Sequence, residues 1–104
     1  MNTAVANKIK SVVHSFIPGA KVLLFGSYAR GEEKQGSDYD LLVITKETFP
    51  PLEKINWRTK IHKQLVHALH APFDVLLDSE EEVTRKKELL GHIIRSAMKE
   101  GIII

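Results

Sequence analysis

The chain has 104 residues, which suffices for one domain with one hydrophobic core, and its 43% hydrophobic and 27% charged content is ordinary for a globular protein. It has no cysteine, so disulfides, thiolate catalysis and cysteine-based metal sites are excluded. The net charge is +2 and the basic residues are scattered, which disfavours nucleic acid as a partner. No run approaches the roughly 18 apolar residues of a membrane span, and the N-terminus lacks a signal-peptide core. We therefore expect a cytoplasmic protein without a membrane partner.

The N-terminal part predicts a helix followed by a buried strand. Apolar side chains at helical spacing predict an amphipathic helix over residues 3–17, which Pro18 and Gly19 end. The run Lys21–Phe25 is short and apolar and is bounded by glycine, as in a strand that is buried on both faces.

A short helix and a second strand follow. Gly26 ends the first strand, and Ser27 is placed to cap a short helix that extends to Arg30. Residues 31–37 predict an exposed loop, because two glycines flank a run of charges. Residues 38–45 predict the second strand.

The next segment predicts a long helix and a third strand. Two prolines at positions 50–51 begin the helix, because proline is well tolerated in a first turn. Its buried stripe continues to about His70. Residues 72–77 then predict a strand with a single carboxylate, Asp74, near its start.

The C-terminal segment predicts one last helix. Ser79, followed by three glutamates that end at Glu82, forms a capping box, and Gly101 stops the helix. Its expected inner face consists of Val83, Leu90, Ile93, Ile94 and Ala97. The closing residues 102–104 are all isoleucine and predict either a short strand packed on the core or part of an interface. We therefore expect an α+β fold, a single domain over residues 1–104 with a small mixed β-sheet covered by helices in the order α-β-α-β-α-β-α.

The pair Gly26-Ser27 is a candidate phosphate site. A side chain at residue 26 would hold a phosphate away from the backbone, so glycine permits close contact. Ser27 adds a hydroxyl and a backbone N–H group. A Gly-Ser pair on its own is also compatible with a simple turn.

The pair Asp38 and Asp40 is a candidate metal site. Tyr39 points to the opposite face of the strand, so both carboxylates face the same place. Two such charges about 4 Å apart repel by about 4 kcal/mol at an effective dielectric constant of 20. Mg²⁺ bound through carboxylates and substrate phosphates would offset that cost. The alternative is a loop end with solvated aspartates.

Several other polar residues are candidates for the same site or for a metal site of their own. Asp74 either tops its strand at the surface or, if its strand lies beside the Asp38–Asp40 strand, ligates a second metal or accepts the proton of an attacking hydroxyl. Arg30 either reaches a phosphate or forms a surface salt bridge with Glu32 or Glu33, and Lys34 is a weaker candidate for a phosphate contact. The helical histidines His62, His67 and His70 lack a further ligand on their face and are interpreted as solvated.

These features together resemble the signature of the minimal nucleotidyltransferases (MNT) of the DNA polymerase beta superfamily. The resemblance rests on Gly26-Ser27, the ten intervening residues, the Asp38-x-Asp40 pair, and the later Phe73-Asp74-Val75. It extends across nearly the whole chain.

The resemblance implies a nucleotidyl transfer, in which a hydroxyl attacks the α-phosphate of a nucleoside triphosphate and pyrophosphate leaves. ATP is the expected donor. It implies that Gly26 and Ser27, with Arg30, hold the triphosphate. Asp38 and Asp40 would bind Mg²⁺, and Asp74 would position or deprotonate the acceptor or ligate metal.

The resemblance also implies a protein partner. A domain of this size leaves little surface to recognise an acceptor, and minimal nucleotidyltransferases commonly pair with a HEPN toxin, which they neutralise as an antitoxin by adding AMP to a tyrosine. Two alternatives stay open: a module that binds nucleotide and neutralises its partner by contact, and a transferase acting on small molecules such as aminoglycosides. A homo-oligomer is compatible with each of these.

Overall fold

The computed structural model describes residues 1–104 as five helices and four strands. In chain order these are α1 (Thr3–Phe16), β1 (Lys21–Phe25), α2 (Gly26–Arg30), β2 (Tyr39–Thr45), α3 (Pro51–Leu69), β3 (Phe73–Ser79), α4 (Glu80–Lys86), α5 (Ile93–Glu100) and β4 (Ile102–Ile103). The predicted α+β class is confirmed. None of the helices combines the length and the apolar character that crossing a bilayer requires.

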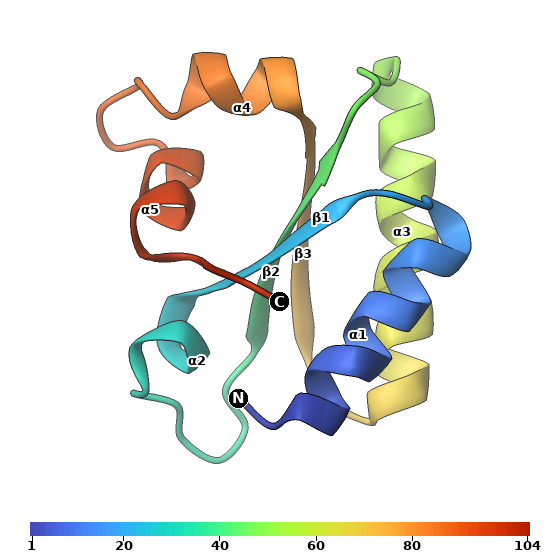
Figure 1. Ribbon diagram of the computed structural model, residues 1–104, viewed down its shortest axis with the longest axis vertical. Coiled ribbons are helices and arrows are strands. Elements are labelled where there is room, and N and C mark those ends of the chain that lie inside the picture. The colour runs from blue at the N-terminus through green and yellow to red at the C-terminus, as the bar shows by residue number, and fades with distance from the viewer.

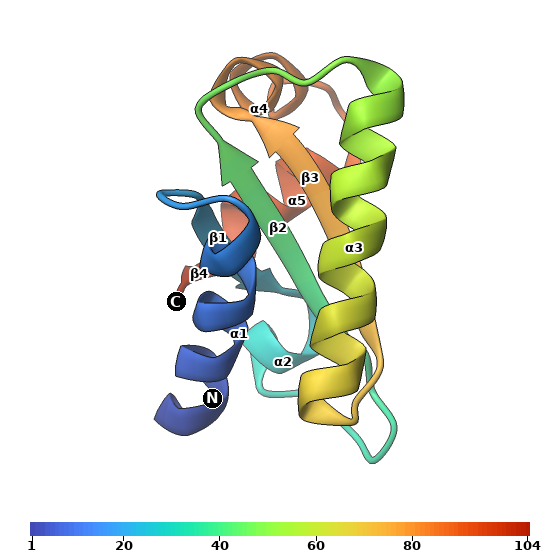
Figure 2. The ribbon, with the colours of Figure 1, turned by 90° about the vertical axis from the view of Figure 1, so that its right-hand side faces the viewer.

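The four strands form one mixed sheet in the order β3-β2-β1-β4. β1 is antiparallel to both β2 and β4, whereas β2 and β3 are parallel. The parallel pair is possible because α3 crosses over the sheet between them (Figure 2). The end of β1 therefore meets the beginnings of β2 and β3 at one edge of the sheet.

Helices cover both faces of the sheet. α1 and α3 lie on one face, and α4 and α5 lie on the other (Figures 1 and 2). The strands supply apolar side chains to both faces because successive side chains point in opposite directions. β1 therefore gives Val22 and Leu24 to the α1–α3 side, and Leu23 and Phe25 to the α4–α5 side.

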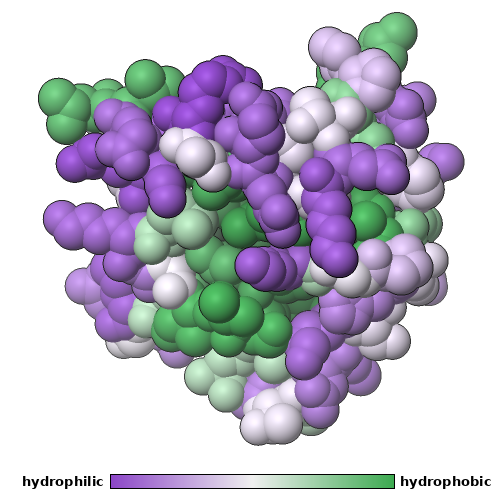
Figure 3. Space-filling model, turned by 45° about the horizontal axis from the view of Figure 1, so that its top comes forward, coloured by the Kyte–Doolittle hydropathy of each residue, from purple (hydrophilic) through white to green (hydrophobic).

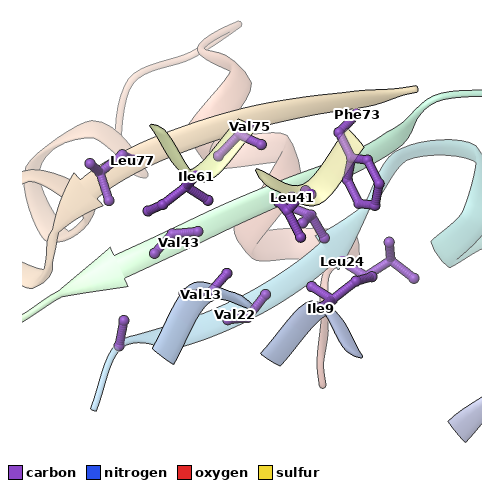
Figure 4. Packing of buried hydrophobic residues seen from close by; sticks show 12 residues of the cluster. Ile9, Val13, Val22, Leu24, Leu41, Val43, Ile61, Phe73, Val75 and Leu77 are labelled. Carbon is purple, nitrogen blue, oxygen red and sulfur yellow. The ribbon is translucent and has the colours of Figure 1, made fainter. Parts of the chain in front are cut away.

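The larger core lies between the sheet and the α1–α3 pair (Figure 4). α1 contributes Ile9 and Val13, α3 contributes Ile61 and Leu65, and each of these side chains is fully buried. Each such side chain contributes about 2 kcal/mol through removal of its surface from water. The smaller core on the other face is built around Val83, Ile94 and Ala97 of α4 and α5.

The prediction of one last helix was wrong. The segment forms α4 and α5, and the residues between them make a turn in which Gly91 has φ +77°. The side chain of His92 then caps α5 by accepting a hydrogen bond from the N–H of Ile94 (3.1 Å). Leu90 lies in this turn and is 87% exposed, so it does not belong to the inner face, and Ile93 is also exposed.

The C-terminal isoleucines form the short strand that was one of the two predicted alternatives. Ile102 and Ile103 pair with Leu24 and Leu23 of β1, and the N–H of Ile104 donates to the carbonyl of Val22. Both β4 side chains nevertheless remain exposed. Figure 3 shows an apolar area amid hydrophilic surface, on the side where Figure 1 places the C-terminus. A role of this strand in an interface stays a prediction.

Candidate active site

The predicted carboxylates gather at one edge of the sheet. Asp40 of β2 lies opposite Asp74 of β3 in the parallel register, and Asp38 immediately precedes β2. Neighbouring strands are about 4.8 Å apart, so the carboxylates of Asp40 and Asp74 are direct neighbours. Asp40 and Leu42 are two residues apart in β2, so their side chains point to the same face of the sheet. Leu42 belongs to the core under α4 and α5, so Asp40 lies on that face.

Three stacked aromatic rings lie next to the carboxylates, on the opposite face of the sheet. The ring of Tyr39 lies between Tyr28, at 3.9 Å between ring centroids, and Phe73, at 5.1 Å. Tyr39 thus points away from the carboxylates, as the alternation predicted. The stack joins α2, β2 and β3, and it holds the residues before and after Tyr39 in place.

Gly26 fits against Asp40 with no room for a side chain. Its backbone adopts φ +72°, and a Cβ atom at this position would lie 2.0 Å from Oδ2 of Asp40. Two separate reasons favour glycine at this position. The left-handed backbone conformation is unfavourable for other residues, and the Asp40 side chain fills the space that a Cβ atom would need. The phosphate-site candidate and the metal-site candidate are therefore in direct contact.

The electrostatics of the site favour a cation. Partial burial raises the pKa of Asp40, and the charges of Asp74 and Asp38 raise it further, while Arg30 acts in the opposite direction. The ionised form of Asp40 is thus disfavoured until a positive charge arrives.

The donor set suits Mg²⁺ bound together with a substrate. No three His, Asp or Glu side chains are gathered closely enough to hold a metal ion by themselves. Mg²⁺ commonly keeps several waters and uses one or two carboxylates plus substrate phosphates, so a complete protein cage is not required. The adjacent, mutually repelling oxygens of Asp40 and Asp74, with Asp38 beside them, fit that chemistry.

Asp74 opens onto a cavity at the outer edge of β3. The cavity measures about 380 Å³ and is lined by Asp74 and its strand neighbours together with Arg58, Thr59 and His62 of α3. Asp74 is exposed and is one of the residues that line this cavity at the edge strand. This cavity had no signal in the sequence, because it depends on how α3 crosses the end of β3.

Two of the three helix histidines are solvated as predicted, and one is not. His67 and His70 are exposed. His62 is half-buried, and its Nε2 lies 3.0 Å from the carbonyl oxygen of Phe73, so it ties α3 to the start of β3. Its role is therefore structural at the wall of the cavity rather than that of a freely hydrated side chain.

The short helix begins two residues earlier than predicted. α2 starts at Gly26, with Phe25 as its N-cap residue and no side-chain cap, so Ser27 occupies the second helical position instead of the cap. The helix ends at Gly31, which has φ +69°. Ser27 nevertheless stands beside Gly26 at the carboxylate edge of the sheet.

Arg30 forms the predicted salt bridge with Glu32 and a second one that the sequence did not indicate. Its Nε lies 2.5 Å from Glu32, and its NH1 lies 3.1 Å from Oε1 of Glu100. The same oxygen of Glu100 accepts a hydrogen bond from the N–H of Gly26 (3.0 Å). Glu100 follows Gly26 by 74 positions, and only the packing of α5 brings the two together.

Comparison with known protein families identifies the domain. The nucleotidyltransferase domain profile matches residues 6–104, which is nearly the whole chain. The chain belongs to the nucleotidyltransferase domain family. Its MNT-like motif residues Gly26, Ser27, Asp38, Asp40 and Asp74 all lie at the one sheet edge described above.

Solved structures share the fold. A toxin–antitoxin complex crystallised with AMP-PNP contains a chain with 22% sequence identity and a TM-score of 0.68, and the match covers 93% of this chain and 69% of that one. The MntA–HepT toxin–antitoxin structure gives 18% identity and a TM-score of 0.64, covering 98% and 70%. A tri-AMPylated HEPN toxin in complex with an MNT antitoxin, from Shewanella oneidensis, gives 20% identity and a TM-score of 0.62, covering 99% and 71%.

Proposed function

We propose that this nucleotidyltransferase domain transfers AMP from ATP to a tyrosine hydroxyl of a HEPN toxin and thereby acts as an antitoxin. The observation that carries the proposal is the in-register pair Asp40 and Asp74, with Gly26 packed against Asp40. The nature of the partner and of the transferred group is supported by the structural neighbours, which include an AMP-PNP complex and a tri-AMPylated HEPN toxin.

In this proposal the edge of the sheet binds the triphosphate. The glycine at position 26 lets a phosphate approach the backbone, Ser27 offers a hydroxyl and an N–H, and Arg30 supplies positive charge. Asp38 and Asp40 would hold Mg²⁺, which would supply positive charge to neutralise the phosphates. Positioning and charge neutralisation provide most of the rate enhancement in phosphoryl-type transfers.

Asp74 faces the acceptor. The acceptor hydroxyl approaches along the outer edge of β3, where Asp74 is exposed and lines the cavity. Asp74 positions the hydroxyl or takes its proton, a bond forms between the acceptor oxygen and the α-phosphorus, and the bond to pyrophosphate breaks. Arg58 on the opposite wall gives the cavity a positive charge that suits an anionic or polar acceptor segment.

The test measures the mass of the partner. The purified chain is incubated with MgATP and with its co-purified partner, and intact-mass spectrometry records AMP additions. The double variant Asp38→Asn with Asp40→Asn is expected to abolish the additions while it stays folded. The double variant Glu80→Gln with Glu81→Gln removes the same charge from exposed positions of α4, and it should behave as the wild type.

The same variants distinguish an AMP-transferring enzyme from a protein that neutralises its partner by binding alone. If the Asp38–Asp40 double variant still added AMP, the assignment of the metal site would be refuted. If it lost AMP transfer and still protected cells from the partner, neutralisation by contact would replace the antitoxin mechanism. Transfer of nucleotide to small hydroxylated compounds, with none to the partner, would favour the small-molecule alternative.

A further inference from the structure

The Glu100 carboxylate accepts hydrogen bonds from the Gly26 N–H and from Arg30. The proposed function assigns these same donors to the phosphates of the nucleotide. Oε1 of Glu100 accepts a hydrogen bond from the backbone N–H of Gly26 at 3.0 Å. The NH1 of Arg30 lies 3.1 Å from the same oxygen and 3.2 Å from Oε2, so both carboxylate oxygens are engaged. Carboxylate and phosphate oxygens accept from the same kinds of donor, and an N–H group has one proton to give.

The position of Glu100 is built into the fold on both sides. Before it, α5 is anchored by the buried side chains of Ile94 and Ala97. After it, Gly101 passes so close to β1 that an added Cβ would lie 2.7 Å from Cδ2 of Leu23. The pairing of β4 with β1 then fixes the chain beyond that point. Figure 1 shows α2 and α5 on the same side of the sheet, which is the arrangement that this contact needs.

Glu100 is partly exposed, is held by two donors and lies near the carboxylates of the site. The side chain of Glu100 is 29% exposed and that of Arg30 is 46% exposed, so water can replace the contact when the side chain moves. Gly26 also packs against Asp40, and the charge of Glu100 adds to the field that disfavours the ionised form of Asp40. A negatively charged group at the position of the Glu100 carboxylate is attracted by Arg30 and repelled by the nearby carboxylates. A phosphate bound there would therefore need Arg30 and a cation to neutralise the carboxylates.

We propose that Glu100 is an internal competitor of the nucleotide, whose carboxylate holds the Gly26 N–H and Arg30 in the free protein and must swing away before a phosphate of the triphosphate can bind there. This inference rests on the proposed function, because it concerns the same site. It makes Glu100 a residue that sets nucleotide affinity without taking part in the chemistry. Its removal should tighten nucleotide binding.

The expected effect follows from the fraction of protein that is free to bind. If the contact holds the closed arrangement about tenfold more often than the open one, the apparent dissociation constant is about tenfold weaker than that of the open form. Glu100→Ala should therefore bind nucleotide about tenfold more tightly than the wild type. Glu100→Gln keeps the shape and loses the charge, so it should fall between the two. Glu88→Ala, an exposed glutamate in the turn before α5, is the matched control and should leave the affinity unchanged.

Two measurements on the full chain test the inference. Calorimetry with Mg²⁺ and the non-hydrolysable analogue AMP-PNP gives the dissociation constants, and steady-state transfer gives KM and kcat. Both the dissociation constant and KM should fall in Glu100→Ala while kcat changes little. In ¹H–¹⁵N spectra the Gly26 amide signal should shift in Glu100→Ala without nucleotide, and AMP-PNP should shift the same signal in the wild type.

The outcomes distinguish this inference from the function on which it rests. If the wild type binds nucleotide and Glu100→Ala binds it equally well or more weakly, Glu100 is no competitor, and the inference alone is overturned. Weaker binding with lower kcat would mark Glu100 as a group that supports the bound nucleotide. If neither the wild type nor the variant binds nucleotide, the proposed function fails and takes the inference with it. Thermal melting of each variant confirms that it is folded.

Discussion

Replacement of Gly26 by alanine tests the contact on which the candidate site is built. The added Cβ would lie 2.0 Å from Oδ2 of Asp40, so the Asp40 side chain must leave its position. The residue also has φ +72°, a left-handed conformation that costs a residue with a Cβ about 1–2 kcal/mol. Forcing the Asp40 side chain off its rotamer adds about 1 kcal/mol. The total loss of unfolding free energy is therefore about 2–3 kcal/mol, or about 10–20 °C in Tm.

A matched glycine separates the two contributions. Gly31 has φ +69°, and an added Cβ there meets nothing within 4 Å. Gly31→Ala should therefore show the backbone cost alone, about 1–2 kcal/mol, and should retain nucleotide transfer. Gly26→Ala should lose more stability than Gly31→Ala and should also lose transfer, because Asp40 is displaced.

Urea denaturation and a double-mutant cycle provide the assay. In an Asp40→Ala background the carboxylate is gone, so Gly26→Ala should cost only the backbone part, about as much as Gly31→Ala. The difference between the two backgrounds is the energy of the contact. Equal losses for Gly26→Ala and Gly31→Ala, with transfer retained in both, would refute the contact between the phosphate and metal sites.

Two further predictions concern charge. Because the pKa of Asp40 is raised in the folded protein, the native state holds its proton more tightly than the unfolded chain, and stability falls as the pH rises from about the reference pKa of 3.8 through the raised value. Asp40→Asn should therefore raise the Tm at pH 7 without divalent ions and have little effect near pH 3.5; an equal effect at both pH values would contradict the argument. Asp78 is buried and pairs with Lys54 and Lys86, so Asp78→Asn leaves Lys86 without its carboxylate partner and Lys54 with Glu82 alone, and should cost about 2 kcal/mol in urea denaturation. Glu81→Gln, an exposed charge on α4, should change stability by less than about 0.5 kcal/mol, and a similar loss in both variants would show that burial of the Asp78 network is irrelevant.

The strands and the carboxylate edge were predictable because local rules dominate there. Apolar runs marked the three long strands, and the two-residue period predicted that Asp38 and Asp40 share one face. β2 begins at Tyr39, so Asp38 lies just before the strand rather than within it. The proximity of Asp74 to Asp40 depends on the parallel pairing of β3 with β2. In the sequence, only the resemblance to a known family indicated it.

The rest depended on contacts between distant segments or on competing local signals. The spacing from Val83 to Leu90 is that of a continuous helix, but Gly91 adopts a left-handed conformation and His92 starts a new helix. The contact between Glu100 and Gly26 spans 74 positions, and no local pattern encodes it. Periodicity describes which face of an element is buried, and it does not describe where the end of one helix meets the beginning of another.

The most direct test of the central claim follows the α-phosphate of the nucleotide. The chain and its partner are incubated with Mg²⁺ and ATP labelled either at the α- or at the γ-phosphate. Nucleotidyl transfer predicts that the α-label becomes attached to the partner while the γ-label leaves with pyrophosphate, and that Asp40→Asn and Asp74→Asn each abolish attachment. Attachment of the γ-label would indicate phosphoryl transfer, and α-label incorporation that survives both substitutions would contradict the assignment of the active site to this edge of the sheet.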